Sequence, residues 1–479
     1  MGPKQPAVTR EARACVLGAG VTGLAAALTL DRHDVYNIIV EAADAVGGLA
    51  RTIERNGFRF DLGGHRFFTK NEAINRLVDD LMGDEMIDVE RKSSIYYNRR
   101  FFDYPLRIPN VLANLGLFRS ARVLADFAWT RTKRIIKPRP AVSVQDWMVD
   151  QFGETLYDLF FRSYTAKVWG LPGDQLSQEW AGQRIRGFSL PAAIKHAILT
   201  SPESKPKTLI DRFRYPRLGI GRLSERMAEE IDKNNHIYLR SRVQSVNHDG
   251  KRITSVEFNN SGTCVRVIAD HYISSIPLTV LLSLMNPPPP PEITAAAAQI
   301  TFRGLAIVHL ALNRPTVTDQ TWIYIQEPSS VVSRIHEPKN WSASMVPESK
   351  TSLVVEIPCS PGDAIWQSSD EDLRRMAVES LEKELGFIRE DEVSDFCVIR
   401  LPKAYPVYHL GYEAALTPLI EHVRRFTNIQ TVGRAGLHKY VNIDHCLECG
   451  ILAARNVLGA AYDLRLVNSE KEYLEEAAS

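Results

Sequence analysis

The chain lacks an excess of charge of either sign, a long apolar run and many cysteines, and each lack excludes a class of protein. With 58 Lys and Arg against 57 Asp and Glu, the net charge predicts no affinity for nucleic acid or acidic membranes. No apolar run reaches the roughly 20 residues of a membrane span. The polar first fourteen residues argue against a signal peptide, and six mostly scattered cysteines suit a reducing cytosol, so we predict a cytoplasmic protein.

Cys446 and Cys449 are the one close pair of cysteines, and their C-x-x-C spacing can mark a redox site or half of a zinc site. The sequence has no second pair, and we expect this one to open a helix that runs to about Asn456. We therefore predict no metal centre, with thiols that pack or line a cofactor cavity. A redox role for the pair stays open.

Near its start the chain has a dinucleotide-binding turn. Cys15–Leu17 predicts a buried strand, and a helix is expected over Thr22–Leu30. Between them, Gly18 permits the tight turn and Gly20 lets backbone approach a pyrophosphate, while Gly23 lets the helix pack on the strand. The helix N-terminus would direct its N–H groups at the phosphates.

The residues after this turn favour FAD over NAD. The apolar strand Asn37–Val40 ends in Glu41, 23 residues after the first glycine of the turn, where a carboxylate can bind ribose hydroxyls. Beyond it, Gly47, Gly48 and Arg51 could bring backbone and a guanidinium to a longer, flavin-bearing diphosphate. The sequence therefore predicts an FAD site.

The segments predict an α/β fold of the glutathione-reductase type, in which both ends of the chain build an FAD-binding Rossmann-like domain. A helical region and an antiparallel-sheet substrate region are inserted between them. The expected divisions are a first FAD-binding segment over residues 1–90, a mostly helical lid over 91–215, a second FAD-binding segment over 216–285, the substrate sheet over 286–410, and a third FAD-binding segment with a C-terminal helix over 411–479.

Several blocks resemble UDP-galactopyranose mutases, with the eukaryotic-type branch nearest, within the protoporphyrinogen oxidase and amine oxidase superfamily. The blocks are Phe60–His65, Tyr104–Leu106, Arg162–Gly170, Gly182–Arg184, Phe213–Pro216, Gly433-Arg434 and Tyr440–His445. They cover most of the chain in the family's order. The flavin motifs at the two ends are shared across the superfamily, whereas the Gly-Gly-His and Lys-Val-Trp-Gly blocks are more specific.

The resemblance implies an FAD-dependent isomerase that interconverts pyranose and furanose forms of a sugar on a nucleoside diphosphate. In that family, N5 of the reduced FAD attacks sugar C1, and the nucleoside diphosphate leaves and later returns. The partner is then a nucleotide sugar. NAD(P)H stays open as reductant although no second dinucleotide fingerprint is present, and a homo-oligomer stays open too.

The same resemblance implies the site residues. His65, Arg184 and Arg334 would be catalytic, the two arginines by clamping the diphosphate with their planar forks. The substrate-binding set would be Tyr104, Arg107, Thr165, Trp169, Tyr405 and Tyr440. Besides the N-terminal glycines, Glu41 and Arg51, the cofactor would contact Gly63, Gly64, Gly433, Arg434 and Asn442.

Two departures from the family concern the nucleobase. Arg107 replaces the glutamine of the family's Tyr-Pro-Phe-Gln block, and Thr165 replaces an asparagine near the uridine. A guanidinium has no acceptor, so Arg107 cannot reproduce the amide's pairing with uracil. We therefore expect the base, the sugar or both to differ from UDP-galactose.

Two other functions stay open. One is an FAD-dependent oxidase or desaturase of the protoporphyrinogen oxidase or amine oxidase type, which would consume oxygen or a quinone. The other is a non-catalytic FAD-binding scaffold. The arginine and tyrosine set favours the mutase, because an oxidase of apolar substrates does not need a diphosphate clamp.

Overall fold

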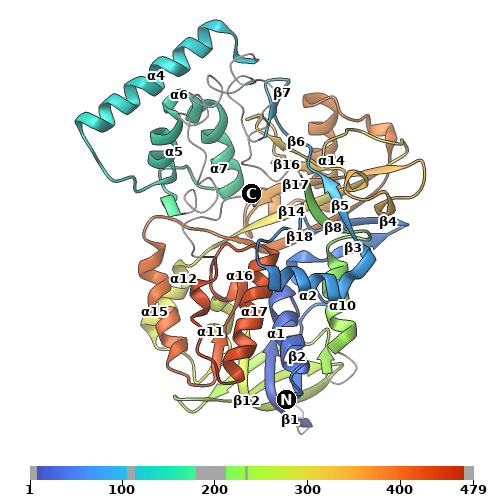
Figure 1. Cartoon of the computed structure of the whole chain (residues 1–479), viewed down its shortest axis with the longest axis vertical. Helices are drawn as coiled ribbons and strands as arrows, with labels where there is room; N and C mark the ends of the chain where they lie inside the picture. The colour runs from blue at the N-terminus through green and yellow to red at the C-terminus, as the bar shows by residue number, and fades with distance from the viewer. Residues whose placement is uncertain (1–7, 105–109, 111–113, 180–211, 232–235, 469–479) are drawn as a thin grey trace.

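The computed structural model describes residues 8–104, 110, 114–179, 212–231 and 236–468. These residues build two large sheets, one toward each end of the molecule, with a group of helices beside the second (Figure 1). The mixed α/β architecture is the one that the sequence predicts.

The first sheet contains the dinucleotide unit. Its central strand β1 (Val8–Leu17) pairs in parallel with β2 (Asn37–Val40) and with β12 (Thr263–Ser274), so segments far apart in sequence are neighbours. The remaining strands are β9 (His236–Tyr238), β10 (Val243–His248), β11 (Ile253–Asn260), β13 (Met285–Asn286) and β19 (Ile429–Thr431). The buried run Ala14–Leu17 is covered on both faces, as strands of parallel sheets usually are.

Helix α1 (Val21–Asp31) follows β1 and lies beside α17 (Ile443–Val457) from the other end of the chain (Figure 1). At the crossing, a Cβ on Gly450 would lie 2.3 Å from the carbonyl oxygen of Thr22 and 2.9 Å from the Cβ of Ala25. The two backbones therefore meet where neither helix carries a large side chain.

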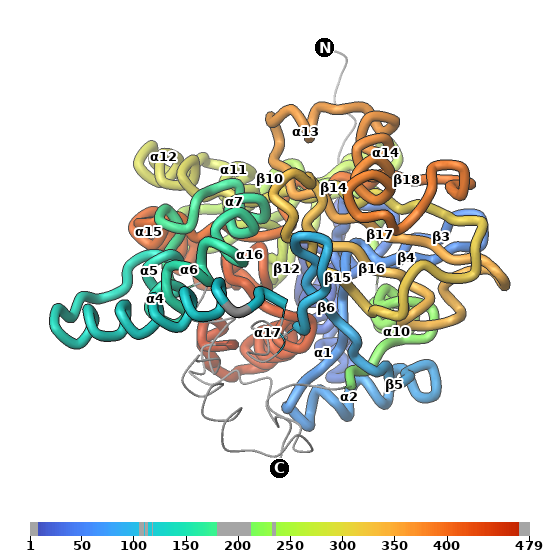
Figure 2. The backbone as a smooth tube through the Cα atoms, turned by 90° about the horizontal axis from the view of Figure 1, so that it is seen from above, coloured from blue at the N-terminus to red at the C-terminus, as the bar shows by residue number. Residues whose placement is uncertain are grey.

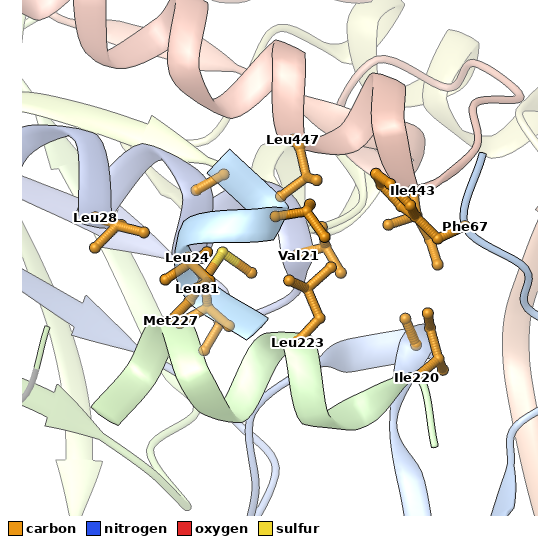
Figure 3. Packing of buried hydrophobic residues seen from close by; sticks show 14 of the residues in the cluster. Val21, Leu24, Leu28, Phe67, Leu81, Ile220, Leu223, Met227, Ile443 and Leu447 are labelled. Carbon is orange, nitrogen blue, oxygen red and sulfur yellow. The ribbon is translucent and has the colours of Figure 1, made fainter. Parts of the chain in front are cut away.

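The third helix against α1 is α10 (Gly221–Ile231). Figure 3 shows Leu24 of α1 packed with Leu223 and Met227 of α10, and Leu447 of α17 on the other side. This apolar cluster joins the second and third predicted FAD-binding segments to the first.

The second sheet lies at the other end of the molecule (Figure 1). In spatial order its strands are β18 (Val393–Pro406), β14 (Phe302–Leu312), β17 (Thr351–Cys359), β16 (Arg334–His336), β15 (Trp322–Ile325), β6 (Ser93–Tyr97) and β7 (Arg100–Asp103). All neighbouring pairs are antiparallel except β15 with β6, which is parallel. The hairpin β6–β7 comes from the region predicted to be mostly helical, yet it extends the predicted substrate sheet.

Beside this sheet lie α4 (Leu117–Ile136), α5 (Val144–Phe152), α6 (Glu154–Tyr157) and α7 (Ser163–Trp169) (Figure 2). Within the described ranges, no helix combines the length and the apolarity needed to cross a bilayer. The expected domain boundaries stay a prediction.

Remaining elements include α2 (Glu72–Met82), α11 (Leu278–Ser283), α12 (Pro291–Gln299), α14 (Asp370–Glu379), α15 (Tyr412–Arg424), α16 (Gly433–Gly436), and the strand pairs β3 (Thr52–Arg55) with β4 (Phe58–Asp61) and β5 (Met86–Glu90) with β8 (Arg212–Pro216). The last residue of the five-proline run, Pro291, is the first residue of α12, where a missing N–H costs nothing.

One expected helix start is wrong. Helix α17 begins at Ile443 rather than at the cysteine pair, because Asn442 has the extended backbone of an N-cap residue and its N–H donates to Nδ1 of His445 at 3.3 Å. Cys446 and Cys449 therefore lie inside the helix. Asp444 is the second helical residue.

We expect Gly450→Ala to destabilise the protein by about 1–3 kcal/mol, the usual cost of overpacking a close contact. A methyl group there meets backbone atoms of α1, which cannot rotate away, and this outweighs the better helix propensity of alanine. Chemical denaturation followed by circular dichroism measures the change. Arg455→Ala, at an exposed position of the same helix, is the control. Equal or higher stability of Gly450→Ala would contradict the close crossing.

Candidate active site

The glycine turn after β1 has the geometry that the sequence predicts. Gly18 has a φ of +98°, and a Cβ on Gly23 would lie 1.9 Å from the Gly18 carbonyl oxygen. Oε2 of Glu41 accepts a hydrogen bond of 2.7 Å from the backbone N–H of Ala19, so the carboxylate is held beside the turn. Strand, turn and acid therefore form one rigid unit.

This unit leaves room for a diphosphate beside the N-terminus of α1. That terminus has Gly20 at its N-cap position with no side-chain cap, and a Cβ on Gly20 would have Gly48 Cα, 4.0 Å away, as its nearest described contact. Gly48 has a φ of +58°. Uncapped N–H groups with bare backbone around them suit an anionic ligand, so these residues fit the FAD diphosphate. Arg51 is engaged differently, in an ion pair of 3.2 Å with Asp44.

The C-terminal segment meets the same turn. Gly433, with a φ of +73°, packs so closely on Thr22 of α1 that a Cβ would lie 2.5 Å from the threonine oxygen, and its N–H donates to Sγ of Cys449 at 3.3 Å. The next residue, Arg434, directs its guanidinium away from this contact. It donates to the carbonyl oxygens of Val441 and Ala404 and lies over the ring of Tyr440 at 4.8 Å.

A row of three side chains crosses the second sheet. Tyr324 of β15, Arg334 of β16 and Glu356 of β17 are successive cross-strand partners and so lie side by side. Nε of Arg334 donates to Oε1 of Glu356 at 2.9 Å, and Nη2 lies 2.7 Å from the same oxygen. The Glu356 side chain is 4 % exposed and that of Arg334 19 %, so the arginine is the accessible partner.

Glu356 also connects this sheet to the loop Gly63–His65. The N–H of Gly64 donates to Oε1 of Glu356 at 3.3 Å, and a Cβ on Gly63 would lie 3.3 Å from the same oxygen. Burial lowers the pKa of Arg334, but the Glu356 carboxylate outweighs burial and raises that pKa, so the pair is ionic.

His65 is close enough to both Arg334 and Arg434 to be affected by their charges. Its Nδ1 is 3.0 Å from the Gly63 carbonyl oxygen, which can only accept, so Nδ1 carries the proton and Nε2 is an acceptor. Burial, together with the charges of Arg434 and Arg334, lowers the pKa of His65 to about 3. The imidazole is therefore neutral at neutral pH.

Aromatic rings complete the surroundings of these charges. Tyr405 stacks on Tyr440 with centroids 6.1 Å apart and meets the edge of Trp169 at 6.0 Å. On the other side, Tyr324 contacts Tyr104 at 4.7 Å and Tyr164 at 6.2 Å. Burial is the main reason that the pKa of Tyr405 is raised, followed by the charge of Glu356.

The lysine of the Lys-Val-Trp-Gly block fixes α7 over the sheet. Nζ of Lys167 donates to the carbonyl oxygens of Ile325, Glu327 and Val332 at 2.8–3.1 Å. Arg303 of β14 binds the carbonyl oxygens at the end of the helix, including that of Val168 at 3.1 Å. The specific block thus positions Tyr164 and Trp169 rather than supplying a reactive amine.

The structure thus brings together a half-buried set that we call the Arg334 cluster. Its members are His65, Tyr164, Tyr324, Arg334, Glu356, Tyr405, Arg434 and Tyr440. Trp169 and Tyr104 contact the cluster, whereas Thr165 is 3 % exposed on α7. Arg184 and Arg107 lie outside the described residues.

Sequence reasoning missed Glu356, the residue that joins the parts of the cluster. The available signal was a single carboxylate within Thr351–Cys359, a strand in which every residue is buried. A buried carboxylate needs a partner, which points to a nearby cation. The sequence did not indicate which cation this would be.

Comparisons with known proteins agree on the fold and differ on the reaction. The family model of flavin containing amine oxidoreductases matches residues 21–458. Coproporphyrinogen III oxidase of Bacillus subtilis (strain 168) is 22 % identical, over 92 % of this chain and 97 % of its own. The enzyme of that name from Staphylococcus aureus is 20 % identical, over 92 % and 98 %. A crystal structure of reduced UDP-galactopyranose mutase has a TM-score of 0.82 at 22 % identity, covering 96 % of this chain and 98 % of that one.

We expect the pH dependence of stability to reveal the neutral state of His65. Its pKa is about 3 in the folded protein and about 6.5 in the unfolded chain, so unfolding takes up a proton below pH ~6.5. Folding stability is then complete above that pH and is lost as the pH falls toward 3. Between about pH 7 and about pH 5, the wild type should lose about 2 kcal/mol more unfolding free energy than His65→Gln.

Urea denaturation at several pH values measures this difference. Other buried histidines, such as His309, occur in both proteins, so their contributions cancel in the comparison. Curves that stay parallel over this range would mean that folding does not lower the pKa of His65.

Proposed function

The chain belongs to the family of flavin containing amine oxidoreductases, and within it we propose a nucleotide-sugar mutase that interconverts pyranose and furanose forms. The observation that carries this proposal is the Arg334 cluster, in which Arg334 pairs with the buried carboxylate of Glu356 and Arg434 lies over the stacked rings of Tyr405 and Tyr440. The structural likeness to UDP-galactopyranose mutase supports the same proposal through the shared fold.

The family implies FAD, and the residues of the first sheet fit it. The glycine turn and the N-terminus of α1 would hold the diphosphate, and Glu41 the ribose. The loop Gly63–His65 would then lie by the flavin ring. When bound and reduced, FAD supplies a nucleophilic nitrogen for covalent catalysis at the sugar C1.

Arg334, together with Arg184, would bind the diphosphate of the substrate, while Arg434 would contact the cofactor. Arg334 and Arg434 carry two positive charges against the single charge of Glu356, so the cluster keeps a positive surplus for an anion. Glu356 fixes Nε and Nη2 of Arg334, which leaves the rest of the planar fork to phosphate oxygens. Tyr405 and Tyr440 would add hydroxyl donors. Such contacts hold the departing nucleoside diphosphate close, so that it can return to C1.

His65 would act as an acceptor rather than as a cation. Its Nδ1–H is held by the Gly63 carbonyl, so Nε2 is the atom that can receive a proton or a hydrogen bond at the site. A neutral imidazole adds no charge beside the arginines. It would therefore orient a donor without competing for the phosphates.

The substrate would differ from UDP-galactose at the base, the sugar or both. Thr165 is buried on α7. Its hydroxyl side chain is shorter than the asparagine that the mutase family has at this position, so it would not reach as far toward a base. Tyr104, by contrast, is exposed and meets the ring of Tyr324 at a tilt of 52°, where it could cover a base.

Porphyrinogen oxidation is the second candidate, and the relatives from Bacillus subtilis and Staphylococcus aureus favour it. A guanidinium fork binds carboxylates as well as phosphates, so arginines alone do not separate the two reactions. The reactions differ in net redox change. A mutase returns an isomer of its substrate, whereas an oxidase consumes an electron acceptor.

The deciding experiment compares these outcomes on one preparation. Protein reduced with dithionite under argon is incubated with UDP-, GDP- and dTDP-hexoses, and products are separated by chromatography and weighed by mass spectrometry. Oxidised protein is given coproporphyrinogen III in an oxygen electrode. A new peak of unchanged mass, formed only by the reduced protein, is expected. Oxygen uptake with porphyrin formation and no isomer would replace the mutase by the oxidase.

We expect Arg334→Lys to weaken nucleoside diphosphate binding about tenfold or more. Lysine keeps the charge opposite Glu356 but lacks the fork, and a hydrogen bond to a charged group contributes about 1.5–3 kcal/mol. Isothermal titration with UDP, GDP and dTDP measures the change, and the flavin content should not fall. Arg266→Lys, in an exposed ion pair on β12, is the control. Unchanged affinity for every nucleotide that binds the wild type would remove Arg334 from the clamp.

A further inference from the structure

Helix α4 presents an apolar face to solvent. Phe118 is 91 % exposed, Ile135 80 %, Ile136 77 %, Trp129 59 % and Leu124 41 %. Single exposed apolar residues are ordinary, but five on one helix are a contiguous feature. The helix lies at the outer margin of the molecule, beside α5 and α6 (Figure 1).

The opposite face of α4 is firmly packed, so the exposed face cannot simply turn inward. Val123 is 2 % exposed in the apolar cluster beneath the helix. Asp126 accepts the N–H of Thr155 at 2.8 Å, and Arg134 forms an ion pair with Asp150. Packing thus fixes which side chains face outward.

The exposed residues follow the helical repeat. Phe118, Trp129 and Ile136 are spaced by eleven and seven residues, close to whole numbers of turns, and so form one stripe. Leu124 and Ile135 extend it on one side. The exposed apolar face therefore runs along the whole helix, and its width would let the helix lie flat on an apolar surface.

The charges around this stripe are all positive. The helix carries five Lys and Arg residues and a single acidic residue, Asp126. Asp126 and Arg134 both make contacts on the packed side of the helix. Arg119, Arg122 and Lys133 follow the border of the stripe next to Phe118 and Trp129, and Nζ of Lys133 lies 5.1 Å from the Trp129 ring. The near-neutral balance of the whole chain conceals this local excess.

We propose that α4 binds an anionic lipid surface, lying in its plane with the apolar stripe inserted between the headgroups. Aromatic and aliphatic side chains bordered by Lys and Arg are the composition of interfacial helices. Anionic headgroups complement the cations, whereas two copies of α4 paired on this face would bring like charges together. The proposal concerns a surface away from the Arg334 cluster and does not depend on the reaction catalysed there.

Flotation of the whole protein with vesicles tests this. Vesicles of phosphatidylcholine and of phosphatidylcholine with phosphatidylglycerol are compared at low and high salt. We expect binding to the anionic vesicles that falls as salt is added, because exposed charges are screened. Phe118→Ser with Ile136→Ser should lower the partition coefficient at least about tenfold. Arg122→Gln with Lys133→Gln should lower it roughly fivefold for each charge.

Leu466→Ser, 65 % exposed outside α4, is the matched control and should bind as the wild type does. All variants are first compared for flavin content and circular dichroism, which these exposed changes should leave intact. Absence of binding to anionic vesicles would overturn the proposal, as would equal binding of the Phe118→Ser, Ile136→Ser protein. An oligomer that this double variant dissociates, without vesicle binding by the wild type, would instead assign the face to a second copy of the chain.

Discussion

The close crossing of α1 and α17 is the contact on which the rest of the structure depends. Gly450 brings the two backbones together at the carbonyl of Thr22, and Gly433 contacts the side chain of the same threonine. The end of the chain is thereby placed against the dinucleotide turn near its beginning. Arg434 and Tyr440 belong to the Arg334 cluster only because α16 and the start of α17 are held there.

A second constraint operates inside the cluster, where Glu356 neutralises some of a concentrated positive charge. One buried carboxylate binds Arg334 and the loop Gly63–His65, so it connects a sheet from the middle of the chain to a loop near its start. Removing one partner of such a buried pair leaves an uncompensated charge, which destabilises a protein more than replacing both partners with apolar residues. Burial of His65, together with the charges of Arg434 and Arg334, lowers the pKa of this histidine and keeps it neutral, so its protonation state depends on the same group of charges.

The family and the cluster together describe a flavin enzyme whose site is cationic and aromatic. Relatives named as porphyrinogen oxidases are similar to this chain over most of its length, and a structural neighbour named as a sugar-nucleotide mutase has the same fold. Function in such a framework is set by the side chains around the cofactor rather than by the fold. The positive border of α4 shows that charge, too, must be judged locally. A net charge close to zero for the whole chain does not exclude a basic surface on one helix.

The sequence by itself determined the dinucleotide unit, because the turn, the packing glycine and Glu41 are specified within a few tens of residues by local backbone geometry. Through the family resemblance it also indicated five of the eight cluster members, namely His65, Arg334, Tyr405, Arg434 and Tyr440. Only the tertiary structure decided that Arg334 pairs with Glu356, since strand register sets that contact and a shift of one residue would separate the two side chains. It likewise decided that the apolar stripe of α4 faces outward, because burial of one helix face depends on what packs against it.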